Sequence, residues 1–410
     1  MVMKKVSFYT ALAFLAVCGQ ASAQTAEKES ILLHLGNGQT WAFPVEDTDS
    51  ITFLKAADTP AGWLYENQVR KETVVRTYYV SSATNGWYYS LENPQVTKFL
   101  NEVTYDNSDY STSSIGTYNN LYTSYKKDQP TSVVITCSED IDSVVLSERP
   151  DFLGKELRAD IDIAVKRFVV SNLIPQKTYY YKAYLADGSI DTGHFHTYGH
   201  LRRIRADGVR NVRDMGGWQT KDGSRIAYGK IFRGGEMDGI HSWHITAKDS
   251  LVFRKVMNIG LDIDFRNAEE TDSSGISPLG KDITYKHYEV AYYQPDSQGY
   301  YDAFRDVLQC LRTGKAVYVH CVVGADRTGM LAYMMAAILG VPEEELCKDF
   351  ELTTFSGQPR YRNGYRMLAF NARLATYGGN DIQERIENMM LAKGVTLEEI
   401  EEFRELMLEK

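Results

Sequence analysis

The stretch that decides the organisation of this chain is His320-Cys321-Val322-Val323-Gly324-Ala325-Asp326-Arg327-Thr328-Gly329. An apolar run typical of a strand precedes it at 316–319, and a run typical of a helix follows it at 330–339. Gly340 comes directly after the second run, where a glycine commonly ends a helix. A strand, a tight loop and a helix in this order create a phosphate-binding site, because the loop amides and the helix N-terminus direct positive charge at one point.

Cys321 and Arg327 stand at opposite ends of this loop, six positions apart. Cationic neighbours and helix N-termini lower the pKa of a thiol, so we expect Cys321 to ionise readily. The planar guanidinium of Arg327 can bind two phosphate oxygens at once. A thiolate that faces a bound phosphate is a nucleophile with its electrophile in place. The other residues predicted to bind the phosphate are Val322, Val323, Gly324, Ala325, Thr328 and Gly329.

The order His-Cys-x-x-Gly-x-x-Arg-Thr resembles the signature of the cysteine-dependent tyrosine and dual-specificity phosphatases. Three earlier motifs resemble, in the same order, those of one bacterial tyrosine phosphatase family, and the resemblance covers roughly residues 200–410. These motifs are Val209-Arg210-Asn211-Val212-Arg213-Asp214-Met215-Gly216-Gly217, then Lys230-Ile231-Phe232-Arg233-Gly234-Gly235-Glu236, then Leu261-Asp262-Ile263-Asp264-Phe265-Arg266 followed by Glu269-Glu270.

This resemblance implies an α/β phosphatase domain with a mostly parallel sheet, and a phosphomonoesterase that acts through a phosphocysteine without cofactor or metal. The substrate that it implies is a phosphotyrosine peptide or a small phosphomonoester. Relatives that act on phosphoinositides carry Lys where this chain has Ala325, which weakens the case for a multiply charged lipid headgroup. Activity on inositol phosphates or other small organic phosphates stays open as an alternative. Nothing in the sequence indicates an oligomeric state.

The oxygen that leaves the phosphorus needs a proton from a general acid. The chain has no Trp-Pro-Asp segment of the kind that supplies this acid in classical tyrosine phosphatases. The resemblance favours Asp326, inside the loop, as the acid. Asp264 is the alternative, together with Asp262 on the same predicted strand beside the loop, although Asp264 can instead form a structural ion pair with Arg266.

Four further residues are expected to support the loop rather than to react. His320 precedes the nucleophile and should fix the loop, or else make ordinary hydrogen bonds in the core. Asn211, Arg213 and Asp214 are expected to brace the loop from behind.

Two other function classes fit the sequence less well. Rhodanese sulfurtransferases also use a cysteine loop that ends near an arginine, but they lack the His-Cys…Gly…Arg-Thr-Gly frame. A non-catalytic phosphate-binding surface protein would have no need of Cys321, Asp326 and Arg327 together.

The chain has 410 residues, more than one ordinary domain, and a formal net charge of −9. This charge gives no basic field, which argues against nucleic acid as a partner.

Residues 1–23 are typical of a secretory signal peptide, with Lys4-Lys5, an apolar run at 8–17 and Ala21-Ser22-Ala23. The run is too short for a transmembrane span, so we predict a periplasmic or secreted protein. Lipidation of Cys18, which would anchor the protein to a membrane, is the alternative.

The predicted organisation after the signal peptide is a small β segment at 24–60, a β-sandwich at 61–198 and the phosphatase domain at 199–410. The first segment contains a hairpin pattern with Gly36-Asn37-Gly38 as its turn. In the second, Leu173, Pro175 and Tyr179 resemble the tyrosine corner of a fibronectin type III domain, in which the Tyr hydroxyl bonds back to the turn. Residues 83–130 show weak periodicity and receive no assigned element.

Helix and strand patterns alternate after residue 199. Capping boxes begin helices at Thr246 and Thr396, and residues 301–312 place their apolar side chains on one face. Such alternation indicates a mostly parallel sheet covered by helices, with the phosphate loop at the carboxyl end of a strand, where these sheets bind ligands.

Overall fold

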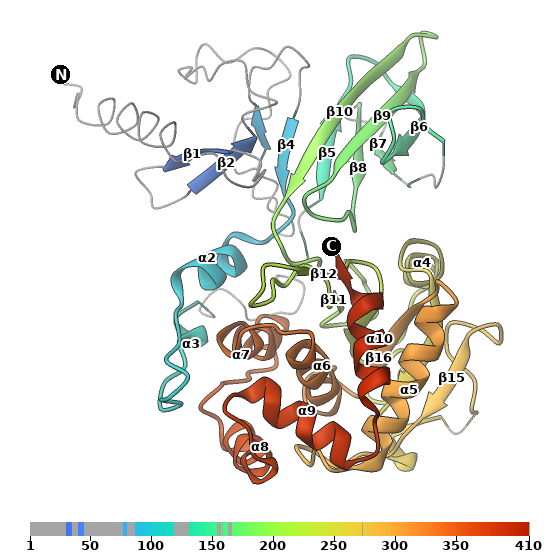
Figure 1. Ribbon diagram of the computed structural model, residues 1–410. Coiled ribbons are helices and arrows are strands. Elements are labelled where there is room, and N and C mark those ends of the chain that lie inside the picture. Colours follow the sequence, from blue (N-terminus) through green and yellow to red (C-terminus); the bar gives the residue numbers. More distant parts are fainter. Residues whose placement is uncertain are drawn as a thin grey trace, which may run out of the picture.

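The computed structural model describes residues 30–34, 40–44, 77–79, 87–118, 130, 132–153, 157, 159–162, 166–272 and 274–409. The predicted signal peptide and Cys18 lie outside these residues. Figure 1 shows a β-rich body, formed by the described strands between residues 30 and 198, and an α/β body that holds the second half of the chain. In the described part of the chain, no helix is long and apolar enough to cross a membrane.

The β-rich body contains a hairpin and two larger sheets. Strand β1 pairs antiparallel with β2, which confirms the hairpin predicted in the 24–60 segment. The five-stranded sheet has the order β3-β4-β10-β9-β6, and the three-stranded sheet has the order β5-β8-β7. All neighbours pair antiparallel except β4 and β10. The strands are β1 (Ser30–His34), β2 (Thr40–Pro44), β3 (Thr77–Tyr79), β4 (Trp87–Ser90), β5 (Val133–Thr136), β6 (Ile141–Ser147), β7 (Asp160–Asp162), β8 (Arg167–Val170), β9 (Thr178–Leu185) and β10 (Ile190–Tyr198).

Alternate side chains along a strand face the same side of a sheet. The apolar side chains on the facing sides of the two larger sheets pack together into one core. Tyr179 lies in this core, and its hydroxyl accepts a hydrogen bond from the backbone N–H of Ile174 at 2.8 Å. The hydrogen bond from the hydroxyl back to the turn is therefore confirmed. The assignment of this body to the fibronectin type III fold stays a prediction.

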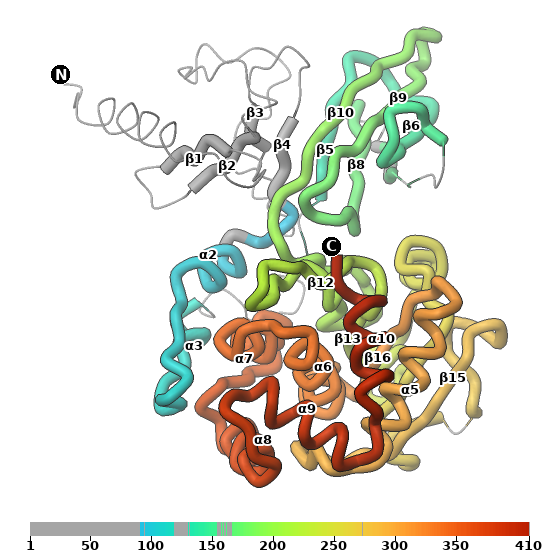
Figure 2. Tube along the Cα trace, viewed as in Figure 1, coloured from blue at the N-terminus to red at the C-terminus, as the bar shows by residue number. Residues whose placement is uncertain are grey.

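Residues 94–118 depart from the all-β expectation for 61–198, because they form the two helices α2 (Pro94–Glu102) and α3 (Ile115–Tyr118). The side chain of Asn93 caps α2 by accepting a hydrogen bond from the Gln95 N–H, and a proline stands in the first turn. Both helices run along the flank of the α/β body in Figure 2, and their apolar residues join its main hydrophobic core. The ring centroids of Phe99 and Phe355, for example, are 5.9 Å apart.

The α/β body is built on a five-stranded sheet of order β11-β13-β16-β14-β15. The three pairings among β13, β16, β14 and β15 are parallel, and only β11 runs antiparallel to its neighbour. The prediction of a mostly parallel sheet is therefore confirmed. The strands are β11 (Arg213–Asp214), β13 (Ile231–Gly234), β14 (Ile259–Asp264), β15 (Thr284–His287) and β16 (Ala316–His320). A short pairing of β12 (Arg225–Ile226) with β17 (Leu408–Glu409) brings the C-terminus back beside the start of this body.

Helices cover both faces of this sheet. Val317 and Val319 of β16 face the main core with α5, α6 and α10, whereas Ala316 and Tyr318 face a second core with the π-helical segment (Val252–Val256) that continues α4. The predicted capping boxes at Thr246 and Thr396 are both present. The helices are α4 (Ala247–Leu251) with its extension (Val252–Val256), α5 (Gln298–Arg312), α6 (Arg327–Ile338), α7 (Glu343–Glu351), α8 (Tyr365–Leu374), α9 (Ile382–Ala392) and α10 (Leu397–Met407).

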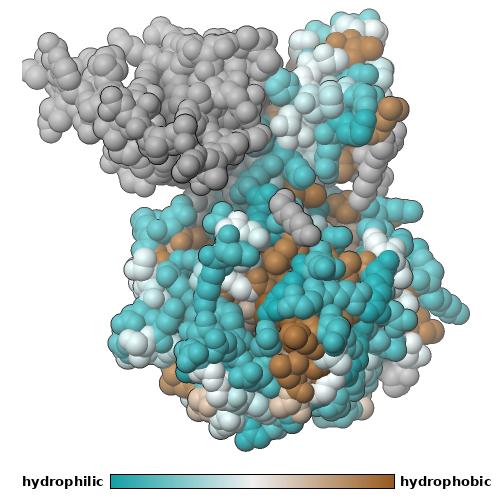
Figure 3. Space-filling model, in the orientation of Figure 1, coloured by the Kyte–Doolittle hydropathy of each residue, from teal (hydrophilic) through white to brown (hydrophobic). Residues whose placement is uncertain are grey.

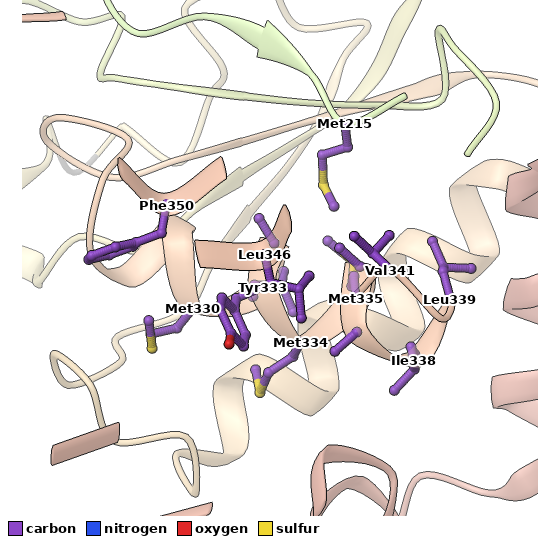
Figure 4. Packing of buried hydrophobic residues seen from close by; sticks show 14 of the residues in the cluster. Met215, Met330, Tyr333, Met334, Met335, Ile338, Leu339, Val341, Leu346 and Phe350 are labelled. Carbon is purple, nitrogen blue, oxygen red and sulfur yellow. The ribbon is translucent and has the colours of Figure 1, made fainter. Parts of the chain in front are cut away.

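Helix α6 is the central helix of the body, and every one of its residues is buried. Its side chains Met330, Met334 and Met335 pack among the other apolar residues drawn in Figure 4. Gly340 follows α6 with a φ of +91°, as predicted for the residue that ends this helix. The face of the α/β body in Figure 3 is largely hydrophilic and is crossed by a narrow hydrophobic band. A fully buried α6 fixes the position of the loop that enters it.

Candidate active site

The predicted phosphate loop connects β16 to α6. His320 is the last residue of the strand, and Arg327 is the first residue of the helix. Gly324, in the middle of the loop, has a φ of +68°, which favours glycine. A Cβ at this position would lie 2.2 Å from the carbonyl oxygen of Gly234 on β13, so the loop backbone lies directly against the neighbouring strand.

Two side chains bind the loop carbonyls from behind. The Asn211 Nδ2 donates to the carbonyl oxygens of Val323 and Gly324 at 3.1 and 3.2 Å, and Arg233 Nη2 donates to that of Gly324 at 2.9 Å. In a trans peptide the N–H points away from the C=O. The N–H groups of Gly324 and Ala325 therefore point away from this support, as phosphate binding requires.

A buried ionic cluster holds these two side chains in place. Arg213 donates to Asn211 Oδ1 at 2.6 Å, and the Asp349 carboxylate accepts from both Arg213 (3.1 Å) and Arg233 (2.9 Å). The prediction that Asn211 and Arg213 brace the loop therefore agrees with the geometry.

The expectation that Asp214 braces the loop is wrong. Its carboxylate accepts hydrogen bonds from the backbone N–H groups of Gly216 and Gly229 and pairs with Arg202 at 3.2 Å. Neighbouring side chains of an extended strand point to opposite faces, so Asp214 lies on the other side of β11 from Arg213. It stabilises the turn after β11 instead.

Cys321 is buried, and its thiol is set up for ionisation. Burial alone raises the pKa of the thiol, but the charge of the Arg327 guanidinium and the polar groups of Thr328 lower it, and the net shift is downward. A buried thiolate beside a fixed cation is the arrangement of a reactive cysteine.

Arg327 is fully buried, and it pairs with Glu270. Its Nη1 lies 2.6 Å from Glu270 Oε2, and its guanidinium lies 4.5 Å from the ring centre of Tyr292. Burial raises the pKa of Glu270, but the hydrogen bond and charge of Arg327, together with the Asn267 N–H, outweigh it and the net shift is downward. Glu270 thus accepts a hydrogen bond from Nη1 of Arg327, a donor that a phosphate would also use.

Asp326 faces three partners and is nearly fully buried. Arg360 binds both of its oxygens, the Tyr293 hydroxyl donates to Oδ1, and Arg366 Nη1 lies 3.5 Å from Oδ1. Burial raises the pKa of this carboxyl, but Arg360, Tyr293 and Arg366 outweigh it and the net shift is downward. Asp326 is therefore an ion-paired carboxylate in this structure.

The alternative acid, Asp264, lies on β14 directly opposite His320 of β16. Arg266 binds both of its oxygens, and the pKa of Asp264 falls to about 2, because His320 and Arg266 outweigh the raising effect of burial. Asp262 lies on the same face and accepts a hydrogen bond from Ser277 at 2.7 Å. Asp264 is thus a partner in a structural ion pair.

His320 lies between these two carboxylates. Its Nε2 is 3.2 Å from Asp262 Oδ1 and its Nδ1 is 3.8 Å from Asp264 Oδ1, without hydrogen-bond geometry, so the attraction is electrostatic. Burial alone lowers the pKa of His320, but Asp264 and Asp262 raise it to about 9. A charged His320 therefore joins the end of β16 to β14, next to the nucleophile.

Of the predicted phosphate-binding residues, Val322 and Val323 are partly exposed. The other four are buried, with Gly324 and Ala325 in the loop and Thr328 and Gly329 in the first turn of α6. The sequence gives no indication of the roles of Asp349 and Arg360, which no motif marks. Glu270 and Arg233 lie within the motifs quoted above, and this position in a motif was the one indication in the sequence that they belong to the site.

Arg210 is a further cation near the loop. It precedes Asn211, its backbone carbonyl accepts from the Gly235 N–H at 3.0 Å, and its guanidinium lies 5.2 Å from the ring centre of Trp243. The Nε is buried and forms no hydrogen bond to any residue that the structure describes. Burial lowers the pKa of Arg210, whereas the charges of Glu236 and Cys321 act to raise it, which places the guanidinium within electrostatic reach of the thiolate.

Residues 204–407 match the sequence profile of the tyrosine phosphatase family. A Cupriavidus necator protein provisionally named a tyrosine-protein phosphatase is 22% identical over 172 residues, which are 35% of this chain and 60% of that protein. Crystal structures of Pseudomonas aeruginosa TpbA, alone and as a Cys-to-Ser variant in complex with phosphotyrosine, align with a TM-score of 0.28. They are 13% and 12% identical and cover 42% of this chain and 91% of TpbA. Residues 204–407, just under half of this chain, therefore carry the sequence pattern of the tyrosine phosphatase family.

Proposed function

We propose that the chain is a cysteine-dependent phosphomonoesterase of the protein tyrosine phosphatase type. The observation that carries this proposal is the buried Cys321, whose pKa is lowered by an Arg327 that stands in the same loop. The loop has the glycine, the rear support for its carbonyls and the helix N-terminus that a phosphate site needs.

The reaction has two steps. The Cys321 thiolate attacks phosphorus, an S–P bond forms, the P–O ester bond breaks, and the departing oxygen takes a proton from Asp326. Water then attacks the phosphocysteine and gives a proton to the Asp326 carboxylate, and the S–P bond breaks to release phosphate and the thiolate. Arg327 and the loop amides hold the equatorial oxygens in both steps.

The acid role requires Asp326 to gain a proton when substrate binds. A phosphoryl dianion in the loop adds negative charge close to Asp326, and a like charge raises the pKa of a carboxyl. The same dianion competes with Glu270 for Arg327. Substrate binding therefore changes both ion pairs of the free site in the direction that the chemistry needs.

A phosphotyrosine side chain is the substrate that the family match favours. The second candidate is a small organic phosphate with another anionic group, such as an inositol phosphate, and Arg210 supports it. Ala325 provides no cation in the loop, but Arg210 provides one from the opposite side, stacked on Trp243. This guanidinium, 5.2 Å from the Trp243 ring centre and close enough to Cys321 to be affected by its charge, is suited to a second phosphate or carboxylate of the substrate.

A phosphate-release screen on the purified chain tests the proposal. The substrates are an aryl phosphate, a phosphotyrosine peptide, a phosphoserine peptide, inositol phosphates and a phosphoinositide, with Cys321→Ser as the negative control. Release from the aryl phosphate and the phosphotyrosine peptide that is lost in Cys321→Ser supports the proposal. No release from any of them by the folded chain would refute it. A preference for inositol phosphates that Arg210→Gln removes would favour the second candidate.

We also propose that the protein is exported. The support is the sequence of residues 1–23 alone. Fractionation of cells that express the full chain tests this proposal, and retention in the cytoplasm with residues 1–23 uncleaved would contradict it.

A further inference from the structure

Arg362 is a fully buried cation whose surroundings come from the segment that precedes the phosphatase motifs. Its guanidinium carbon lies 4.3 Å from the ring centre of Tyr105 and 4.2 Å from that of Tyr110. Its Nη2 donates to the backbone carbonyls of Asp106 (2.9 Å) and Asp109 (3.3 Å). Its Nε and Nη1 have no hydrogen-bond partner among the residues that the structure describes, so the two tyrosine rings are its main stabilising contacts.

A second contact of the same segment is with Glu351, at the end of α7. This buried carboxylate accepts hydrogen bonds from the Tyr105 hydroxyl (2.5 Å), the Ser113 hydroxyl (2.5 Å) and the backbone N–H of Arg362 (2.7 Å). At the surface, Asn363 Nδ2 donates to the carbonyl of Ser111 at 3.1 Å. We call residues 105–113 the strap, because they hold both ends of one connection, α7 and the chain at 362–363.

The connection that the strap holds is the loop at 357–364, and this loop carries Arg360. The backbone of Arg360 is fixed by Thr354, whose hydroxyl accepts from the Arg360 N–H and donates to the Arg360 carbonyl, both at 2.9 Å. Its side chain reaches the catalytic loop and binds Asp326 through Nε (2.7 Å) and Nη2 (2.6 Å). The strap therefore fixes Glu351 and Arg362, which lie on either side of Arg360 in the chain, and Arg360 in turn binds Asp326.

We propose that the strap is part of the catalytic unit and positions Arg360 on Asp326. This proposal rests on the phosphatase function proposed above. The strap does not touch the reacting atoms, so its residues are positioning residues. Loss of the strap contacts frees the loop at 357–364, Arg360 leaves Asp326, and the proton affinity of the acid changes.

A double-mutant cycle on the full chain tests this proposal. The strap variant Tyr105→Phe/Ser113→Ala removes two hydroxyl donors to Glu351 and keeps most of the side-chain volume. It is made alone and combined with Arg360→Gln, and the pH dependence of kcat/KM is measured on an alkyl phosphate ester. Tyr118→Phe is the matched control, because the Tyr118 hydroxyl bonds Glu102 within the same segment and not the loop at 357–364.

We expect the strap variant to move the alkaline limb of the profile to higher pH, in the same direction as Arg360→Gln, and to have no further effect when Arg360 is already Gln. Asp326 faces Arg360, Arg366 and Tyr293, and an arginine beside a carboxyl lowers its pKa by about 1–3 units. A strap variant that loses activity equally in both backgrounds, or that leaves the profile unchanged, would overturn the proposal.

Two further measurements keep the outcome decisive. If the strap variant does not fold, Asn363→Ala removes the exposed contact to Ser111 without opening the core, and it must move the profile in the same direction. If the wild-type chain releases no phosphate, the proposed function fails, but the strap is still tested by NMR. The Asp326 carboxyl must then titrate at higher pH in the strap variant than in the wild type.

Discussion

Arg360 binds both carboxylate oxygens of Asp326, with its Nε 2.7 Å from Oδ1 and its Nη2 2.6 Å from Oδ2. The two residues are 34 positions apart in the chain, yet the pair sets the charge of the residue that we propose as the acid. A cation in this position stabilises the carboxylate that must accept a proton from water in the second step. The same cation disfavours the protonated carboxyl that must donate a proton in the first step. The Arg360–Asp326 pair therefore favours the second step at the expense of the first.

Replacing Arg360 by Gln should move the alkaline limb of kcat/KM to higher pH. Burial raises the pKa of Asp326 and Arg360 lowers it, so removal of Arg360 leaves the raising effect of burial less opposed. Because kcat/KM reports the free enzyme, the limb should move upward by about 1–3 pH units. The measurement is a pH–rate profile on an alkyl phosphate ester, with Arg373→Gln, at an exposed ion pair with Asp296, as the control. An unmoved limb would mean that Asp326 is not the acid or that Arg360 does not set its charge.

Asp326→Asn should slow the hydrolysis of esters with poor leaving groups far more than that of an activated aryl phosphate. Proton donation matters most when the leaving oxygen departs as an unstable anion, and the loss of a general acid costs about 10²–10⁴-fold. The measurement is kcat/KM over a series of leaving groups for Asp326→Asn, Asp264→Asn and Asp262→Asn. The assignment is wrong if Asp264→Asn or Asp262→Asn shows the selective loss and Asp326→Asn does not.

Cys321→Ser should abolish turnover and keep phosphate binding. The hydroxyl is not ionised at neutral pH, while the carbonyl contacts that shape the loop do not involve the sulfur. Turnover is measured on an aryl phosphate, and binding is measured by titration with phosphate or vanadate. Cys310→Ser, a half-buried thiol on α5, is the matched control and should keep full activity. Residual turnover at the wild-type rate in Cys321→Ser would exclude a phosphocysteine.

The ion pairs of His320 should make folding stability fall at alkaline pH. The pKa of His320 is about 9 in the folded protein, above its ordinary value of about 6.5. The stabilisation is therefore complete below pH about 6.5 and is lost as the pH rises through about 9. The free energy of unfolding is measured across this window in a Cys321→Ser background, so that the nearby thiol does not contribute.

His320→Gln in the same background should flatten the pH dependence, while His244→Gln, at an exposed histidine, should not. An NMR titration gives the same quantity directly. A His320 that titrates near its ordinary value would show that the two carboxylates do not hold its proton.

The local parts of the site were predictable from the sequence because their chemistry is contiguous. The loop from Cys321 to Arg327 lies between a strand and a helix whose apolar patterns are unambiguous, and the parallel sheet follows from the alternation of elements. The ion pairs that set the charge of Asp326 and Arg327 were not predictable. Arg360 and Glu270 reach the loop only through the tertiary fold, and nothing in the sequence around Arg360 marks it.

Two features were predicted incorrectly from the sequence, the role of Asp214 and the absence of a helix at 94–102. Asp214 follows Arg213 in the chain, but consecutive residues of a strand point to opposite faces, and only Arg213 reaches the loop support. Helix α2 was missed although its signals were present. Asn93 and Pro94 begin it, and Val96, Phe99, Leu100 and Val103 have the i, i+3, i+4, i+7 spacing of an apolar helix face.

The contact between Gly324 and Gly234 determines what could be transplanted to another protein. A Cβ on Gly324 would collide with the Gly234 backbone, and a Cβ on Gly234 would lie 2.3 Å from the Tyr318 hydroxyl. The ten-residue motif is therefore not a portable module. If the motif is grafted into another α/β protein, the adjacent strand must also have a glycine at the position of Gly234. Without it, a side chain on that strand would collide with Tyr318.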